Sequence, residues 1–178
     1  MGVFNRLFNK KSVNAVENEY FIDLIKFKCN NTALGEQPTL KEHFCESFDE
    51  NGCFDDKFNG VELGLSHRSL DYVFVSLKTF NGKFFVNGTD LPIGIDSCEK
   101  DIIKLFGVPY WRDEDENEVI LFYEDGHIEL QFEFPKKATL AFITMMKSPI
   151  LEDPEHRKSY KVTKPWPPNT KIQIQNFK

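Results

Sequence analysis

Two clusters of carboxylates are the groups in this sequence best suited to recognise a charged partner. Their members are Asp49, Glu50, Asp55 and Asp56 in the first and Asp113, Glu114, Asp115 and Glu116 in the second. Clustered carboxylates create a negative potential that steers a basic partner toward the protein. The alternative is that they are solvated turns that keep the chain soluble. We expect both clusters on one rim of the fold, because each follows an equivalent element of an internal repeat.

An aromatic pair, Tyr110 and Trp111, precedes the second cluster. Tyrosine and tryptophan are enriched among the residues that contribute most to protein interfaces. The pair is therefore a candidate partner-binding site beside the charged residues. The alternative is that Trp111 caps the core.

Residues for covalent or metal chemistry lack the spacing that such chemistry requires. A Ser or Cys nucleophile needs a base within reach, but the chain has no Gly-x-Ser-x-Gly motif. Cys45 lies two residues after His43, so the two point away from each other on a helix. His67 and His127 occupy similar turn positions, where histidines are usually solvated. We expect a non-enzymatic protein with no catalytic residue, no metal and no cofactor.

Composition defines the broad class of protein. The chain has 178 residues, is 40% hydrophobic and carries a formal charge of −6, which suits a packed core and argues against nucleic-acid binding. No apolar run approaches the ~20 residues of a membrane span, and the N-terminus lacks the apolar core of a signal peptide. The four cysteines show no CxxC pair and are interpreted as reduced thiols. We therefore expect a cytoplasmic protein without a transmembrane segment.

The first 20 residues form a separate N-terminal segment. Within residues 1–12, Val3, Phe4, Leu7 and Phe8 have the spacing of one helix face, and basic residues lie elsewhere. Three interpretations stay open: docking on the body of the protein or on a partner, contact with an anionic membrane surface, or a frayed terminus.

An internal repeat organises the middle of the chain. Val61–Leu65 aligns with Val119–Tyr123 at an offset of 119 − 61 = 58, and the apolar residues that follow keep the same offset. We expect a first unit at residues 21–80, a second at 81–148 and a Pro-rich tail at 149–178 that wraps an edge of the sheet. The tail could add a short strand at Lys171–Phe177.

Each unit is expected to contain one helix. The first helix begins with the capping box Thr39-Leu40-Lys41-Glu42 and ends near Gly52. The second is capped by Asp96 with Glu99, carries apolar residues through Phe106 and stops at Gly107.

Strands and hairpins are the clearest local signals. Asn81-Gly82 and Asp125-Gly126 are dipeptides typical of two-residue hairpin turns. Strict alternation in Ile128–Phe134 predicts one apolar face and one solvated face, and a further strand is expected at Ala138–Met145. The solvated face would carry Glu129, Gln131 and Glu133. The aromatic residues of the strands are assigned mostly to the core: Tyr72, Phe74, Phe80, Phe84, Phe132 and Phe134.

The second unit resembles a known repeat. Gly94-Ile95-Asp96-Ser97, a helix ending at Leu105-Phe106-Gly107-Val108-Pro109, and a following alternating strand resemble the β-lactamase-inhibitor-protein-like fold. The resemblance covers about 50 residues of this unit; the first unit matches loosely and lacks the Gly-x-Pro after its helix. It implies that a helical segment packs on one face of an antiparallel sheet, and that tandem copies of the unit form one wide, curved sheet. It implies no active site.

Together these observations predict an α+β protein in which two strand-helix-strand-strand units form one curved antiparallel sheet with helices on one face. For function we expect a protein-binding module, most concretely an intracellular bacterial immunity protein that holds a cationic toxin. The opening residues are also similar in style to such proteins. The alternative is a small-ligand-binding protein or enzyme that uses the concave sheet as a pocket, and a third is an assembly component docked through residues 1–12. A large cavity lined by His or carboxylates would favour the enzyme, and a flat aromatic-acidic patch would favour the binding module.

Overall fold

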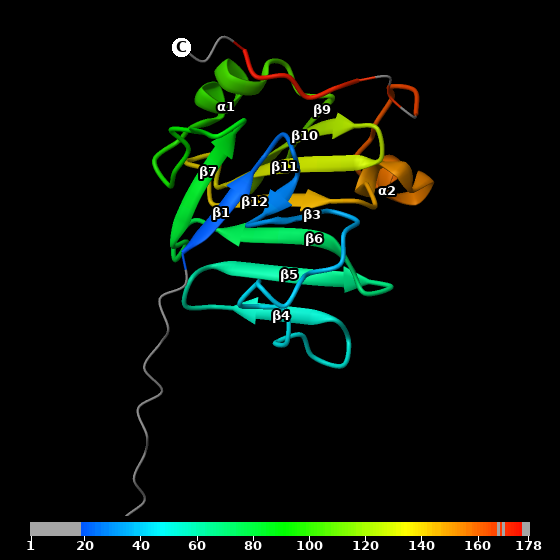
Figure 1. Cartoon of the computed structure of the whole chain (residues 1–178). Helices are drawn as coiled ribbons and strands as arrows, with labels where there is room; N and C mark the ends of the chain where they lie inside the picture. Colours follow the sequence, from blue (N-terminus) through cyan, green and yellow to red (C-terminus); the bar gives the residue numbers. More distant parts are fainter. Residues whose placement is uncertain (1–18, 167, 169, 176–178) are drawn as a thin grey trace, which may run out of the picture.

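The protein is a two-sheet β structure. A computed structural model describes residues 19–166, 168 and 170–175, and the amphipathic segment predicted at residues 1–12 lies outside them. The described residues form twelve strands and only two short α-helices (Figure 1). The predicted α+β architecture is therefore wrong, because two β-sheets form the layers and the predicted layer of helices is replaced by a second sheet.

The larger sheet has seven antiparallel strands. Its spatial order is β4 (Cys53–Asp56), β5 (Val61–Ser66), β6 (Ser69–Ser76), β12 (Phe142–Met146), β11 (Ile128–Pro135), β10 (Glu118–Asp125) and β9 (Trp111–Glu114). Adding 58 to the bounds of β4 gives those of β9, and the same shift superimposes β5 on β10 and β6 on β11 within one residue. Two meanders with one spacing thus lie on either side of β12.

The smaller sheet has five strands and lies across one face of the larger sheet (Figure 1). Its order is β3 (Thr32–Ala33), β2 (Lys28–Cys29), β1 (Tyr20–Asp23), β7 (Gly82–Val86) and β8 (Thr89–Asp90). Strands β1 and β7 are parallel, and Tyr20 is opposite Gly82. Parallel neighbours need a long connection, and the whole β4–β5–β6 meander lies between these two strands in the chain.

The main core fills the space between the two sheets. Strand side chains alternate between faces, so Ile22 of β1 and Phe84 of β7 meet the inward residues of the large sheet, such as Val73 and Leu121. Phe132 contributes to the same cluster through its ring contacts with Phe106 and Tyr123.

Helix α1 (Glu99–Phe106) confirms the helix predicted in the second unit. It buries Ile102, Leu105 and Phe106, and Gly107 ends it at φ 76°, a conformation that glycine adopts without a Cβ clash. Its cap differs from the prediction: the Asp101 carboxylate accepts a hydrogen bond from the Cys98 amide at 2.8 Å.

The helix predicted after Thr39 is absent, and residues 40–46 form turns instead. Tertiary contacts explain the difference. The Glu42 side chain is buried and accepts a hydrogen bond from the Asn31 amide at 3.2 Å. The carboxylate that was expected to cap the helix is therefore bound to another segment of the chain.

The hairpin predicted at Asn81-Gly82 is also wrong, because β6 and β7 belong to different sheets. A hairpin with an Asn-Gly loop instead occurs at Asn87-Gly88, between β7 and β8, with φ values of 50° and 81°. The hairpin predicted around Asp125-Gly126 is present, but its two-residue loop is Gly126-His127, because Asp125 belongs to β10 and pairs with Ile128 of β11. The strand predicted at Ala138–Met145 is present in shortened form as β12 (Phe142–Met146), and residues 138–141 lie before it in a loop.

The C-terminal tail covers a face of the large sheet rather than its edge. The 3-10 helix η1 (Ile150–Glu152) and helix α2 (Pro154–Ser159) begin the tail. Leu151 of η1 and Tyr160, Val162 and Trp166, which follow α2, form a second small core against β9 and β10, whereas Ile172 joins the main core. The strand proposed at Lys171–Phe177 is not formed by residues 171–175, the part of it that is described. No described helix is long and apolar enough to cross a bilayer.

Candidate functional site

The outer face of the large sheet is the surface that the smaller sheet does not cover. Its side chains form rows across the strands, such as Asp55, Glu62, Phe74, Thr144, Gln131, Phe122 and Trp111. The tail covers the half on β9–β11. We call the other half the open face and define it by Asp55, Glu62, Tyr72, Phe74, Phe142 and Met146. Each of the six is at least partly exposed among the described residues.

Tyr72 is fixed on the open face by its neighbours on β5. Its ring packs directly against Gly64, and a Cβ added to this glycine would come within 1.9 Å of the ring. Its hydroxyl donates a hydrogen bond to Glu62 at 2.5 Å, and Cys53 Sγ lies 3.8 Å from the hydroxyl oxygen. Burial and the hydrogen bond to Glu62 raise the pKa of Tyr72, so the hydroxyl stays protonated at neutral pH.

Phe74 and Phe142 form the apolar part of the open face. Their rings stack with centroids 5.4 Å apart and an interplanar angle of 26°, a favourable offset arrangement. Beside them lies a shallow hollow of about 260 Å³, bordered by Tyr72, Met146 and Asp71. This volume falls below the ~300–1,000 Å³ typical of pockets for drug-sized ligands.

The chemistry of the open face is therefore that of a contact surface. It combines aromatic side chains in fixed positions with the carboxylates of Asp55, Glu62 and Asp71. Sequence reasoning assigned Tyr72 and Phe74 to the core and missed this surface. The signal was present, because Tyr72 and Phe74 alternate with Val73 and Val75 and so point away from the core.

The covered half of the outer face holds a buried carboxyl pair. Glu124 and Glu129 are register partners and are 2% and 0% exposed. The Glu129 carboxylate accepts hydrogen bonds from the amides of Ile150 and Leu151, at the start of η1, at 3.3 Å each. Burial and then the carboxyl group of Glu129 raise the pKa of Glu124 to about 11.

The burial of Glu129 contradicts the prediction that one face of β11 is exposed to solvent. The alternation itself is right, but Glu129 and Gln131 lie beneath the tail and are buried, and Glu133 is half-buried. Burial raises the pKa of Glu133 as well. A second layer of chain, which strand periodicity cannot indicate, therefore decides the environment of this face.

The two acidic clusters do not share a rim. They flank β4 and β9, which are the opposite edge strands of the seven-stranded sheet. Six strand spacings separate these edges, which corresponds to roughly 29 Å at ~4.8 Å per spacing. The expected single electronegative rim is therefore wrong, and each cluster has its own surroundings.

Half of the first cluster serves the fold. The Asp49 carboxylate accepts hydrogen bonds from the amides of Asn51 and Cys53 at 2.9 and 2.8 Å, and these bonds lower its pKa. The Asp56 carboxylate accepts a hydrogen bond from the buried Tyr20 hydroxyl at 2.9 Å. Glu50 and Asp55 are exposed.

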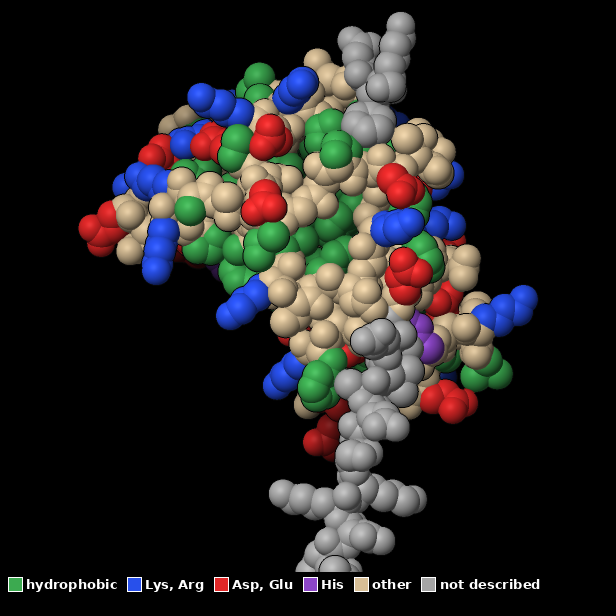
Figure 2. Space-filling model, turned by 90° about the vertical axis from the view of Figure 1, so that its left-hand side faces the viewer, with side chains coloured by type: hydrophobic (Ala, Val, Ile, Leu, Met, Phe, Trp, Pro, Cys, Tyr) green, Lys and Arg blue, Asp and Glu red, His purple; other side chains and the backbone are tan. Residues whose placement is uncertain are grey.

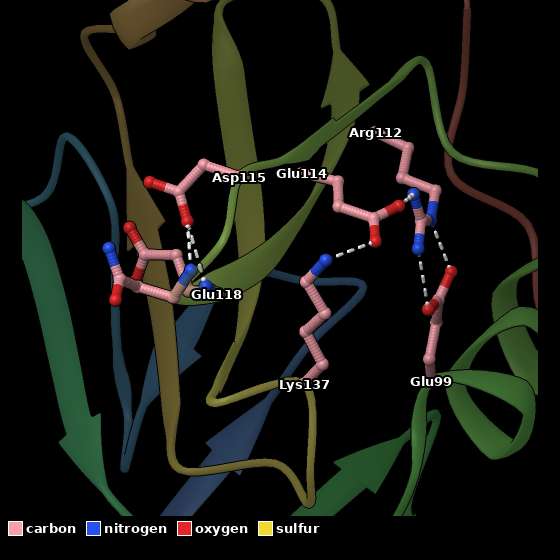
Figure 3. A network of polar contacts seen from close by, with 7 residues as sticks. Glu99, Arg112, Glu114, Asp115, Glu118 and Lys137 are labelled. Carbon is pink, nitrogen blue, oxygen red and sulfur yellow. Dashed lines mark hydrogen bonds and ion pairs between the residues drawn. The ribbon is translucent and has the colours of Figure 1, made fainter.

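The second cluster forms a network of polar contacts on the β9–β10 hairpin (Figure 3). Arg112 bridges Glu99 of α1 and Glu114, and Lys137 Nζ lies 2.6 Å from Glu114. Lys137 and Arg112 lower the pKa of Glu114 to about 2. The Asp115 carboxylate accepts hydrogen bonds from the amides that follow it in the turn. Among the described residues, these contacts involve Glu114 and Asp115 of the cluster, whereas Asp113 is half-buried and Glu116 is exposed.

Tyr110 and Trp111 are part of the small core rather than an exposed binding site. Trp166 of the tail packs against the Tyr110 ring at 6.0 Å, and Lys164 Nζ donates to the Tyr110 carbonyl at 2.6 Å. Trp111 is half-buried in the same cluster. These contacts agree with the alternative interpretation of the sequence, in which Trp111 caps a core.

The surroundings of the described histidines bear on metal and catalytic chemistry. His67 and His127 line one hollow at the ends of two hairpins, with Asp71 on the same wall. Among the described residues, no three His, Cys, Asp or Glu side chains are grouped so that they could hold a metal ion. His43 packs against the Tyr20 ring, and burial lowers its pKa.

A second depression lies at the end of the sandwich that carries α1 and β7. Figure 2 shows hydrophobic side chains gathered in the middle of this face and bordered by charged ones. The larger of two adjoining hollows there has a volume of about 820 Å³. Two of its carboxylates are Asp96 and Asp101, but Asp101 is bound to the Cys98 amide, which lowers its pKa. One of the two carboxylates is therefore engaged in capping helix α1.

Comparison of the chain with protein-family models, with curated proteins and with solved structures finds no match. The resemblance of the second unit to the β-lactamase-inhibitor-protein-like repeat therefore stays a prediction.

Proposed function

We propose that this chain is a non-enzymatic protein-binding module, and most concretely a cytoplasmic bacterial immunity protein that neutralises a cationic toxin. The observation that carries the proposal is the open face. It presents stacked aromatic rings beside carboxylates on a rigid sheet, which is the flat aromatic-acidic patch expected of a binding module.

Charge complementarity indicates the kind of partner. The chain has a formal charge of −6, and Asp55, Glu62 and Asp71 border the aromatic part of the open face. A basic protein surface would be attracted to these carboxylates and would bury the Phe74–Phe142 stack on contact. Glu62 would then pair with a partner cation while Tyr72 holds its carboxylate in place.

The test is binding to the product of the neighbouring gene, because immunity genes lie beside the genes of their toxins. Phe74→Ser and Phe142→Ser should each weaken the complex at least about tenfold, equivalent to about 1.4 kcal/mol. The matched control is Phe21→Ser, an aromatic side chain that is 41% exposed on the other sheet. Melting temperatures of all three variants establish that the fold is retained.

Charge variants test the electrostatic part separately. Glu62→Gln and Asp71→Asn should lower the association rate, and added salt should diminish the difference from the wild type. Unchanged affinity in the Phe74 and Phe142 variants would remove the open face from the proposal. Failure of the neighbouring product to bind would contradict the immunity role itself.

A further inference from the structure

The groove at the end of the sandwich has apolar side chains at its centre and charged side chains at its border. We call it the end groove and define it by Phe80, Leu91, Ile93, Ile95, Leu105 and Gln175. Two hollows of about 820 and 350 Å³ share Ile93, Gly94 and Ile95 and so form one continuous depression. Ile95 is 48% exposed there. Figure 2 shows this side of the molecule, with hydrophobic side chains at its centre.

The chain enters the described structure beside this groove. Tyr20 is the register partner of Gly82, and its amide donates to the Asn81 carbonyl at 3.0 Å. Gly82 itself lines the smaller hollow. Residues 13–18 can span about 20 Å when extended, so residues 1–12 are within reach of the whole groove.

The charges of the two parts are complementary. Residues 1–12 contain Arg6, Lys10 and Lys11 and no carboxylate, which gives +3, so the remaining residues carry −6 − 3 = −9. Asp90, Asp96 and Asp101 border the end groove, against the two ammonium groups of Lys83 and Lys104. The segment would therefore be drawn to a body of opposite charge.

We propose that residues 1–12 bind the end groove of their own chain as an amphipathic helix, with Phe4, Leu7 and Phe8 on the apolar floor. A helix of 12 residues is about 18 Å long and marginal by itself in water. Burial of its apolar face stabilises it, as in other helix-in-groove contacts. Attachment to Tyr20 gives the segment an effective concentration of about millimolar, so weak contacts suffice.

Hydrogen–deuterium exchange of the full chain tests the proposal. In the triple variant Phe4→Ser, Leu7→Ser, Phe8→Ser, amides of residues 93–97 should exchange at least about threefold faster than in the wild type, because groove opening is no longer opposed. Ile95→Asp should produce the same increase. Adding Ile95→Asp to the triple variant should increase the exchange rate little further, since both changes disrupt the same contact between the segment and the groove. The controls are Val13→Ser with Val16→Ser, in the linker, and Val108→Asp, which is 84% exposed outside the groove.

Three outcomes would overturn the proposal. The first is unchanged exchange at residues 93–97 in the triple variant. The second is exchange that depends on protein concentration, which would assign the groove to a second copy of the chain. The third is strict additivity of the triple variant with Ile95→Asp, which would show that the two sites act independently.

Discussion

The carboxyl groups of Glu124 and Glu129 face each other across β10 and β11 as register partners, and both side chains are buried. Two carboxylates so placed cannot both ionise at low cost, and Glu124 retains its proton because its pKa is raised. Glu129 binds the start of η1 through two backbone amides. The ionisation of Glu124 on β10 is therefore linked, through Glu129, to the packing of η1 against the sheet.

Glu124→Gln should stabilise the protein increasingly as pH rises. The folded chain holds the Glu124 proton more tightly than the unfolded chain. The protonated side chain therefore contributes its full stabilisation below pH 4.5, the unfolded pKa, and this stabilisation is lost as the pH rises toward the folded pKa of about 11. The loss is at most about 1.4 kcal/mol per pH unit, and the amide does not titrate. The increase in the free energy of unfolding caused by Glu124→Gln, measured in denaturant melts, should be larger at pH 8 than at pH 5 by roughly 2–4 kcal/mol. Glu116→Gln, an exposed control, should show little such trend; a gain independent of pH would contradict the assignment.

Gly82→Val should destabilise the fold through the pairing of β1 with β7. A Cβ at Gly82 would lie 2.2 Å from the Tyr20 carbonyl oxygen, so one parallel strand must move. We expect a loss of about 1–3 kcal/mol by thermal denaturation, as for other overpacked sites. Gly94→Ala is the control, because no atom lies within 4 Å of its added Cβ. Equal melting temperatures for the two variants would mean that β1 and β7 do not approach so closely.

Arg68→Gly should stabilise the β5–β6 hairpin. His67 and Arg68 form its two-residue loop with φ values of 50° and 67°, a left-handed conformation that favours glycine. Relief of this strain should add about 0.5–1 kcal/mol to the free energy of unfolding. Arg68→Ala removes the same charge and keeps the Cβ, so a similar gain for that variant would attribute the effect to charge.

Asp115→Ala should lower the melting temperature, whereas Glu116→Ala should leave it unchanged. The Asp115 carboxylate accepts hydrogen bonds from the Asn117 and Glu118 amides at 2.6 and 2.9 Å and so orders the β9–β10 turn. Because these bonds lower the pKa of Asp115, the difference between the variants should diminish as pH falls toward its titration range. If neither Asp115→Ala nor Glu116→Ala changes the melting temperature, residues 113–116 form only a solvated turn.

The sequence by itself determined the local elements of this protein. The repeat offset of 58 is reproduced in the strands of the large sheet, and apolar spacing with Gly107 located helix α1. These signals are readable because side-chain alternation, helical spacing and the preference of glycine for positive φ operate between neighbours in the chain.

Tertiary structure alone decided which elements form layers and which surfaces are exposed. The Glu42 carboxylate bonds to Asn31 instead of capping a helix, and the tail buries Glu129 and Gln131 while Tyr72 and Phe74 stay at the surface. The order of strands separates the acidic clusters to opposite edges of the sheet. Each outcome depends on contacts between segments far apart in sequence, whose free energies outweigh local propensities. For that reason alternation could specify that Phe74 and Glu129 share one face, but only packing decided that one is open and the other buried.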